Sequence, residues 1–308
     1  MKRRPTSNKI SSDRRLSGLH SHKREVDPCA RAVKCRGMAD TNTYQSWFTL
    51  RMMALYFVLT FAITWAILIP VLSSVPEESL TLFFVFPAFG PFLAAIVVIG
   101  INRGRSGLIQ WLRQVFKIRV PIVLYLAGAF FLPVGIGALH YTLYWVLGGR
   151  SDLSTAAPWF IYPIALLLTL LTGGNEEPGW RGFALPALLK RFHPVPASLI
   201  LGFFHAAWHL PVMNYYDTTF GWYLFNVIPL TFILNWLYLK SHQSVIPVML
   251  LHSGMNVISS FIPTPGDVLQ GLGTWVFLRG IVYWGIAIVL LITTKGRLGH
   301  DTTDCSNA

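Results

Sequence analysis

Residues 166–182 read LLLTLLTGGNEEPGWRG, an apolar run that ends in two adjacent carboxylates and an arginine. The apolar part has the composition of a membrane helix, where an ionisable side chain costs roughly 2.5–3.5 kcal/mol on insertion scales. Such a residue usually faces a partner or a water-filled cavity. The stretch that contains Glu176, Glu177 and Arg181 therefore indicates a functional site inside a membrane fold.

The composition of the whole chain supports a membrane protein. Of its 308 residues, 53% are hydrophobic and 12% are charged, whereas soluble domains carry about 25% charged residues. A bilayer-spanning helix needs about 20 mostly apolar residues. The sequence predicts an all-α polytopic transmembrane helix bundle of about eight spans, near residues 52–72, 82–101, 121–146, 158–175, 195–212, 221–239, 244–262 and 275–293.

The two ends of the chain differ from the apolar middle. Residues 1–46 hold 11 Lys or Arg and 4 Asp or Glu and lack apolar runs, so we expect a disordered basic cytoplasmic tail and no nucleic-acid-binding segment. Translation can begin at Met1 or at Met38. Residues 47–295 form the predicted membrane domain, and residues 296–308 a short polar cytoplasmic tail.

The positions of the basic residues predict the topology. The connection 102–119 carries five Lys or Arg and no acid, and positive residues stay in the cytoplasm. Lys190, Lys240 and Lys295 follow the fourth, sixth and eighth predicted spans, so they lie on the same side of the membrane as the connection 102–119. We therefore expect an integral protein of a prokaryotic cytoplasmic membrane with both termini inside the cell. Residues 106–119 fit either an interfacial helix on the inner leaflet or a basic loop.

The two carboxylates at 176 and 177 have different predicted partners. Glu177 and Arg181 are four residues apart, so on a helix they form an ion pair. Glu176 then points elsewhere and is available as a general base. The flanking Gly173-Gly174 and Pro178-Gly179 pairs indicate a broken helix that lines a cavity. The alternative is a cytoplasmic helix start, whose acids favour the positive end of the helix dipole.

Two further polar pairs occur at helical spacing. His205 and His209 share a helix face at a spacing used by metal ligands. His252 and Asn256 share another face, and both side chains can donate hydrogen bonds to a developing oxyanion or serve as metal ligands, although Asn is a poor ligand for zinc. The alternative for each pair is hydrogen bonding between helices, which is also our interpretation of three other polar residues within spans: His140, Asn226 and Asn235.

The order Glu-Glu-x3-Arg, x3-His and His-x3-Asn across residues 80–293 resembles the CAAX-protease and bacteriocin-processing (CPBP or Abi) family of intramembrane proteases, in its prokaryotic form. The resemblance implies an endopeptidase of membrane-associated or lipid-modified proteins or peptides, in which a glutamate activates water. The implied catalytic residues are Glu176, Glu177, Arg181, His209, His252 and Asn256. In one departure, the family's usual Phe or Trp four residues before His209 is His205, whose role stays open.

The resemblance also bears on cofactors. With water held by Glu176 and His209 and the oxyanion by His252 and Asn256, no cofactor is required. If zinc is bound, the expected ligands are Glu176, His209 and His252. The site is expected within the bilayer, near the cytoplasmic side. The substrate, its prenylation and the oligomeric state are not specified by the sequence. The rival functions are a bacteriocin immunity or scaffold protein and an ion- or proton-coupled transporter.

The predicted topology can be tested with the native cysteines. Cys29, Cys35 and Cys305 all lie in the two tails, which the distribution of basic residues assigns to the cytoplasm. A membrane-impermeant thiol reagent added to intact cells should modify none of them, and all three should react after permeabilisation. Modification of either tail in intact cells would refute an even number of spans with both ends inside.

Overall fold

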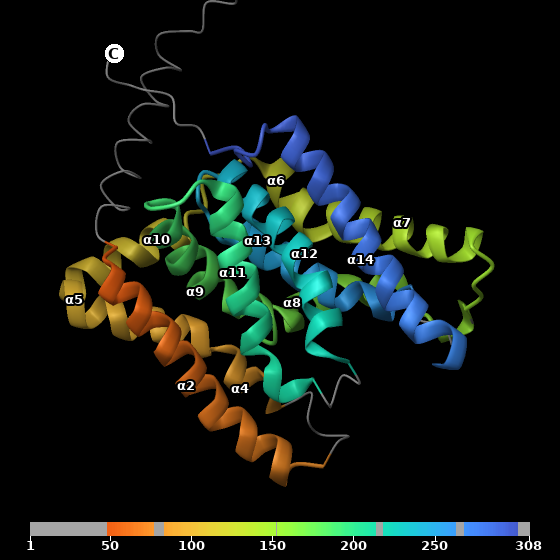
Figure 1. The fold of residues 1–308 in the computed structure, drawn as a ribbon, viewed down its shortest axis with the longest axis horizontal. Coiled ribbons are helices and arrows are strands. Elements are labelled where there is room, and N and C mark those ends of the chain that lie inside the picture. The colour runs from red at the N-terminus through yellow and green to blue at the C-terminus, as the bar shows by residue number, and fades with distance from the viewer. Residues whose placement is uncertain (1–47, 77–82, 152, 214–217, 263–267, 301–308) are drawn as a thin grey trace, which may run out of the picture.

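The computed structural model describes residues 48–300 apart from 77–82, 152, 214–217 and 263–267. These described residues form helices and connecting turns and contain no strand, so the predicted all-α class is confirmed. The helices pack side by side in one bundle (Figure 1). The predicted tail at 1–46 and residues 301–308 lie outside the described part of the chain, and with them the three cysteines.

The helices carry the labels of Figure 1, with η for short 3₁₀ or π-helical turns. In chain order they are α2 (Leu50–Ser74), α4 (Val85–Ala88), α5 (Gly90–Val115), α6 (Ile122–Leu126), η1 (Ala127–Phe131), α7 (Leu132–Val146), η2 (Leu153–Thr155), η3 (Trp159–Ile161), α8 (Tyr162–Thr169), η4 (Gly174–Glu176), α9 (Glu177–Gly179), η5 (Trp180–Ala184), α10 (Leu185–Leu189), α11 (Pro194–Trp208), η6 (Leu210–Val212), α12 (Phe220–Lys240), α13 (Ile246–Val257), η7 (Ile258–Ser260) and α14 (Val268–Thr293).

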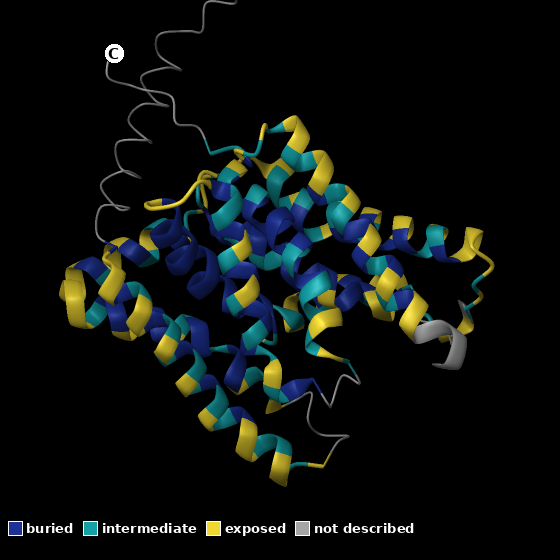
Figure 2. Ribbon diagram, viewed as in Figure 1, coloured by how far each residue is buried: buried dark blue, intermediate teal, exposed yellow. Residues whose placement is uncertain are grey.

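Five of the eight predicted spans form helical segments long and apolar enough to cross a bilayer. They are Leu50–Ser74, Val85–Val115, Ile122–Val146, Phe220–Lys240 and Gly273–Thr293. Their outward faces expose large apolar side chains such as Val58, Leu139 and Ile292, and exposed residues follow the outer surfaces of α2 and α14 (Figure 2). An apolar outer surface suits hydrocarbon rather than water, so the chain is an integral membrane protein.

The other three predicted spans contain shorter helices. The segment 158–175 holds α8, 195–212 holds α11 and 244–262 holds α13. The longest of them, α11, has 15 residues and is therefore about 22 Å long, whereas the hydrocarbon core measures about 30 Å. Two of them end at polar pairs singled out in the sequence: α11 ends directly before His209, and α13 ends directly after Asn256.

Residues 176–194, which lie between the predicted spans 158–175 and 195–212, are mostly helix. After a break at residues 170–176, the chain continues through α9, η5 and α10, and these segments are buried (Figure 2). The Gly and Pro residues that indicated a broken helix interrupt it only locally, because apolar residues such as Trp180, Phe183 and Leu188 pack into the core immediately afterwards. Residues 162–189 thus form one interrupted helical unit that ends at Lys190.

The basic segment at 106–119 is helical through Val115. Gly104 has φ 62°, a left-handed conformation that glycine adopts readily, and it divides α5 into two helices at a kink. Beyond the kink, Gly107, Trp111 and Val115 form a buried face. The Trp111 indole donates a hydrogen bond of 2.9 Å to the carbonyl of Gly182. The segment is therefore a helix rather than a loop, with its apolar face packed against Gly182; its position on the inner leaflet stays a prediction.

A close contact between α9 and α5 holds the interrupted unit in place. A Cβ atom added at Gly179 would lie 2.4 Å from the backbone carbonyl group of Pro91. Real Cβ atoms do not approach backbone so closely, so only glycine permits this packing. The contact places the carboxylate pair at the start of α9 deep inside the bundle.

This contact predicts an effect on stability. Gly179→Ala should destabilise the protein by about 1–3 kcal/mol, the usual range for overpacking a filled core. Gly100→Ala is the matched control, because no atom lies within 4 Å of the added Cβ and alanine favours helix. Thermal unfolding in detergent measures both. A Gly179→Ala protein that unfolds at or above the wild-type temperature would contradict the packing argument.

Candidate active site

The first element of the site is the close packing of η4 against α13. A Cβ atom at Gly173 would lie 2.4 Å from the Asn256 side-chain nitrogen, and one at Gly174 would lie 2.6 Å from the Ser253 hydroxyl. The two glycines therefore let α13 approach the carboxylate pair. This packing brings the His252 face of α13 next to the start of α9, although 75 residues separate His252 from Glu177.

Glu177 is the centre of a buried ion-pair network. The Arg181 guanidinium donates to Glu177 Oε1 at 2.9 Å, and both side chains are 0% exposed. His252 Nδ1 lies 2.6 Å from the same oxygen and donates to it, because an ionised carboxylate only accepts. Arg181 Nε also donates to Asn235 Oδ1 at 3.1 Å. The network links α9, η5, α12 and α13.

Asn235 extends this network to a further helix. Its side-chain amide nitrogen donates to the Ser198 hydroxyl of α11 at 2.9 Å. The interpretation of Asn235 as a hydrogen-bonding link between helices agrees with these contacts. The hydrogen bond between Asn235 and Arg181 was not predicted. The two residues are 54 positions apart, and a single Asn gives no periodic pattern in the sequence.

Glu176 points to a different set of partners. Its Oε2 lies 3.1 Å from His205 Nε2, and both side chains are buried. His209 Nδ1 lies 2.9 Å from the backbone carbonyl oxygen of His205. Since a carbonyl only accepts, His209 donates through Nδ1, and in the neutral ring Nε2 then carries a free lone pair. The adjacent carboxylates thus differ in environment, one ion-paired and the other facing two imidazoles.

His205 has a place that the sequence left open. It sits between the Glu176 carboxylate and the ring of Trp180, whose centroid is 5.1 Å away. Its Nδ1 is buried and has no hydrogen-bond partner among the described residues. His205 is therefore oriented by the Glu176 contact and by ring packing.

A metal ion would find a suitable donor set here. One ligand atom each from Glu176, His205 and His209 lie within 4.8 Å of one another, and one carboxylate oxygen with two imidazole nitrogens is a ligand set that zinc uses. This cluster differs from the expected Glu176, His209 and His252. His205 takes the place of His252, whose Nδ1 is engaged by Glu177.

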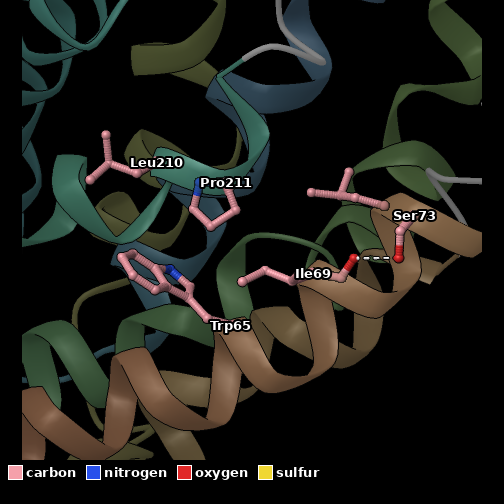
Figure 3. Close-up of a pocket in the computed structure, with 6 residues that line it drawn as sticks. Trp65, Ile69, Ser73, Leu210 and Pro211 are labelled. Atoms are coloured by element: carbon pink, nitrogen blue, oxygen red, sulfur yellow. Dashed lines mark hydrogen bonds between the residues drawn. The ribbon is translucent and has the colours of Figure 1, made fainter.

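The segment after α11 is held by a tryptophan of α2. The Trp65 indole donates a hydrogen bond of 2.9 Å to the carbonyl of Trp208, one residue before His209. Beside this contact lies an open apolar groove of about 530 Å³, where Trp65 and Ile69 of α2 face Leu210 and Pro211 (Figure 3). The position of His209 therefore depends on how α2 packs.

Four of the candidate residues line one cavity of about 720 Å³: Glu176, His209, His252 and Asn256. Asn256 is exposed within it, whereas Glu177 and Arg181 are fully buried behind it. The cavity wall also includes Arg279, whose Nε donates to Asn226 Oδ1 at 3.2 Å. The structure thus brings together residues spread over 80 positions of the sequence.

The fold and the site define a class of protein: an α-helical membrane protein with a buried polar centre made of two carboxylates, three imidazoles and an amide. Residues 158–258 match the family described as type II CAAX prenyl endopeptidase, Rce1-like. A similar protein is the CAAX prenyl protease 2 of Methanococcus maripaludis, 23% identical over 220 residues, which cover 67% of this chain and 79% of that protein.

Both matches agree with the family resemblance that the sequence motifs indicated. The matched segment contains every residue of the candidate site, from Glu176 to Asn256. The stretch outside it, including α2 and the first half of the bundle, supplies packing contacts such as Trp65 with Trp208.

The ion-pair network predicts how the fold responds to substitution. Arg181→Met leaves the Glu177 carboxylate buried with a partner lost, which should destabilise the protein by about 3–5 kcal/mol. Adding Glu177→Leu removes the stranded charge and should recover much of this loss. Thermal unfolding in detergent compares both with Arg191→Met at an exposed position. An Arg181→Met protein as stable as wild type would show that the pair does not support the fold.

Proposed function

We propose that the chain is an intramembrane endopeptidase that hydrolyses a peptide bond in a membrane-associated protein or peptide. The observation that carries the proposal is the shared cavity, in which the Glu176 carboxylate faces the same space as His209, His252 and Asn256. A carboxylate without a cationic side chain bound to it is suited to accept a proton, and Glu177 rather than Glu176 holds the arginine.

In the proposed first step, Glu176 removes a proton from a water molecule, and the water oxygen attacks the carbonyl carbon of the scissile bond. His209 supports this step, because its free Nε2 can accept a hydrogen bond from the same water. His205 is a positioning residue, since its Nε2 contacts Oε2 of Glu176 and fixes the carboxylate. These roles require that the cavity admits both water and an extended peptide.

The attack produces a tetrahedral intermediate with a negative oxygen. The Asn256 amide, which lies over Gly173, is a donor for this oxygen, and His252 donates from Nε2 when its ring is protonated. The Glu177 carboxylate favours that protonated ring through its 2.6 Å contact with Nδ1. Collapse of the intermediate breaks the C–N bond, and the proton held by Glu176 passes to the leaving amine.

A zinc ion held by Glu176, His205 and His209 would lower the pKa of a bound water and polarise a carbonyl. The donor cluster fits such an ion. Glu176 and His209 would then act as ligands, whereas His252 and Asn256 are not part of this cluster and would keep their proposed role as donors to the carbonyl oxygen. The glutamate mechanism and the metal-assisted mechanism therefore differ in what activates water, and removal of metal distinguishes them.

The relative from M. maripaludis is named for the cleavage of CAAX prenyl proteins, which suggests substrates attached to the membrane. The cavity of about 720 Å³ lies in the range of peptide and small-ligand sites. Its wall is mostly apolar and includes the polar side chains of Glu176, His209, His252 and Asn256. We propose a short extended segment next to a membrane anchor as the substrate.

The role of Glu176 predicts a large loss of turnover. Glu176→Gln keeps the size and a hydrogen bond to His205 but cannot take a proton, so cleavage should fall at least about 10²-fold, as for other general bases. The measurement is proteomics of membrane fractions from cells that make the wild type or the variant, with precursor proteins accumulating in the variant. Ser106→Ala, at an exposed position far from the cavity, is the control for expression and insertion.

Two outcomes decide between the alternatives. If Glu176→Gln processes the same precursors as wild type, Glu176 is not the base and the protease proposal loses its mechanism. If a zinc chelator abolishes processing and added zinc restores it, the cluster with His205 and His209 holds a functional metal. Processing that is insensitive to the chelator supports the glutamate mechanism.

A further inference from the structure

Arg279 is a cationic side chain within a membrane-spanning helix, and the proposed mechanism does not use it. It belongs to the segment Gly273–Thr293 of α14 and lines the same cavity as Glu176. An ionisable residue within a span is costly and usually faces a functional partner or a cavity. Arg279 lies outside residues 158–258, so the family match assigns it no role. Its presence in the cavity wall therefore requires an explanation from its own surroundings.

The described part of the chain offers Arg279 no carboxylate partner. The acidic residues in this part are Glu176 and Glu177. Glu176 contacts His205, and Glu177 forms its ion pair with Arg181. Within the described ranges Arg279 forms no salt bridge, so its positive charge is available to an anion that enters the cavity.

Asn226 of α12 orients the Arg279 guanidinium. Arg279 Nε donates to Asn226 Oδ1 at 3.2 Å, and the Asn226 amide nitrogen donates to the carbonyl of Trp222 at 3.0 Å. Asn226 is buried, so contacts within the bundle fix both halves of its amide. The two terminal nitrogens of Arg279 have no hydrogen-bond partner among the residues that the structure describes. Such a pair of nitrogens matches the two oxygens of a carboxylate.

This guanidinium is close to the groups proposed for catalysis. The ring of Tyr223 lies 4.9 Å from the ring of His209, measured between centroids. Asn226 follows Tyr223 by three residues on α12, which is about 4.5 Å along the helix axis. Tyr223, His209, Asn226 and Arg279 all line the cavity that contains Glu176. One bound peptide can therefore reach both the proposed base and the guanidinium.

The surroundings of Arg279 strengthen its interaction with an anion. Trp275 and Tyr283 lie four residues before and after it on α14, so the three share a helix face. Both aromatic residues are buried and line the same cavity. A charge-assisted hydrogen bond between such apolar side chains is stronger than one in water, because the local dielectric constant is low.

We propose that Arg279, oriented by Asn226, binds a carboxylate of the peptide substrate. The proposal rests on the endopeptidase function and adds a specificity-determining residue to it. The carboxylate is that of the peptide's C-terminus or of an Asp or Glu side chain near the scissile bond, since both present two oxygens to the guanidinium. Because Arg279 attracts this group and the Glu176 carboxylate repels it, the peptide lies in the cavity in one direction.

The test measures binding without cleavage, in the full-length Glu176→Gln protein in detergent. The probe is a dansyl-labelled Ala-Leu-Ala-Leu peptide, used as the free acid, as the C-terminal amide, and as the amide of Ala-Leu-Asp-Leu. Fluorescence anisotropy gives a Kd for each. We expect one of the two anionic peptides to bind at least about 10-fold more tightly than the neutral amide, as for hydrogen bonds to charged groups. Preference for the free acid identifies a terminal carboxylate, and preference for the Asp peptide a side-chain carboxylate.

Two variants test whether Arg279 causes this preference. Arg279→Gln removes the cation. Asn226→Asp keeps Arg279 and supplies it with an internal carboxylate of nearly the same size as the amide. In either variant the anionic peptides and the neutral amide should bind with similar Kd values. Arg191→Gln, which removes a cation at an exposed position, is the matched control and should keep the full preference.

The proposal is overturned if the three peptides bind equally or not at all, or if the preference survives Arg279→Gln. Equal binding is the result expected if a carboxylate outside the described residues, such as that of Asp267, neutralises Arg279. Binding and processing also fail separately. A preference that Arg279→Gln abolishes supports this subsite even where Glu176→Gln cells process every precursor. Loss of processing in Glu176→Gln cells without any preference leaves the protease function standing and refutes the subsite.

Discussion

The structure depends on how a buried negative charge at Glu177 is compensated. A carboxylate that is 0% exposed within a membrane protein needs cationic and hydrogen-bonding partners, because an uncompensated buried charge is strongly destabilising. Arg181 supplies one partner from the next helical turn, and His252 supplies another from α13. Because one oxygen accepts from both, the distance between the two helices and the orientation of the His252 ring are set together.

Because the charge of Glu177 is compensated by Arg181, the two neighbouring carboxylates can have different functions. Residues of the same type, one position apart, face different directions on the helix and meet different environments. Glu177 is held by a guanidinium, whereas Glu176 meets the imidazole of His205 and opens onto the cavity. Assigning different roles to two carboxylates through their surroundings is a recurring way for enzymes to divide acid–base chemistry.

Local spacing explains which parts of this arrangement could be predicted. The i to i+4 relation of Glu177 and Arg181 is a property of one helix, and apolar runs predict membrane helices without further information. The contact of His205 with Glu176 and that of Asn235 with Arg181 join helices distant in sequence, so they depend on tertiary packing. The continuation of this helix to Leu189 was not predicted, because Pro178 and Gly179 disfavour helix locally, whereas burial of the following residues maintains it.

The hydrogen bond from Trp65 to the carbonyl of Trp208 connects the site to the physical state of the lipid. With 25 residues, α2 is about 37 Å long, more than the hydrocarbon thickness of about 30 Å, and a helix of this length adapts to its bilayer by tilting. A change in that tilt moves Trp65 and, through it, the residue before His209. Through this hydrogen bond, the thickness of the bilayer around α2 is mechanically connected to the backbone beside His209.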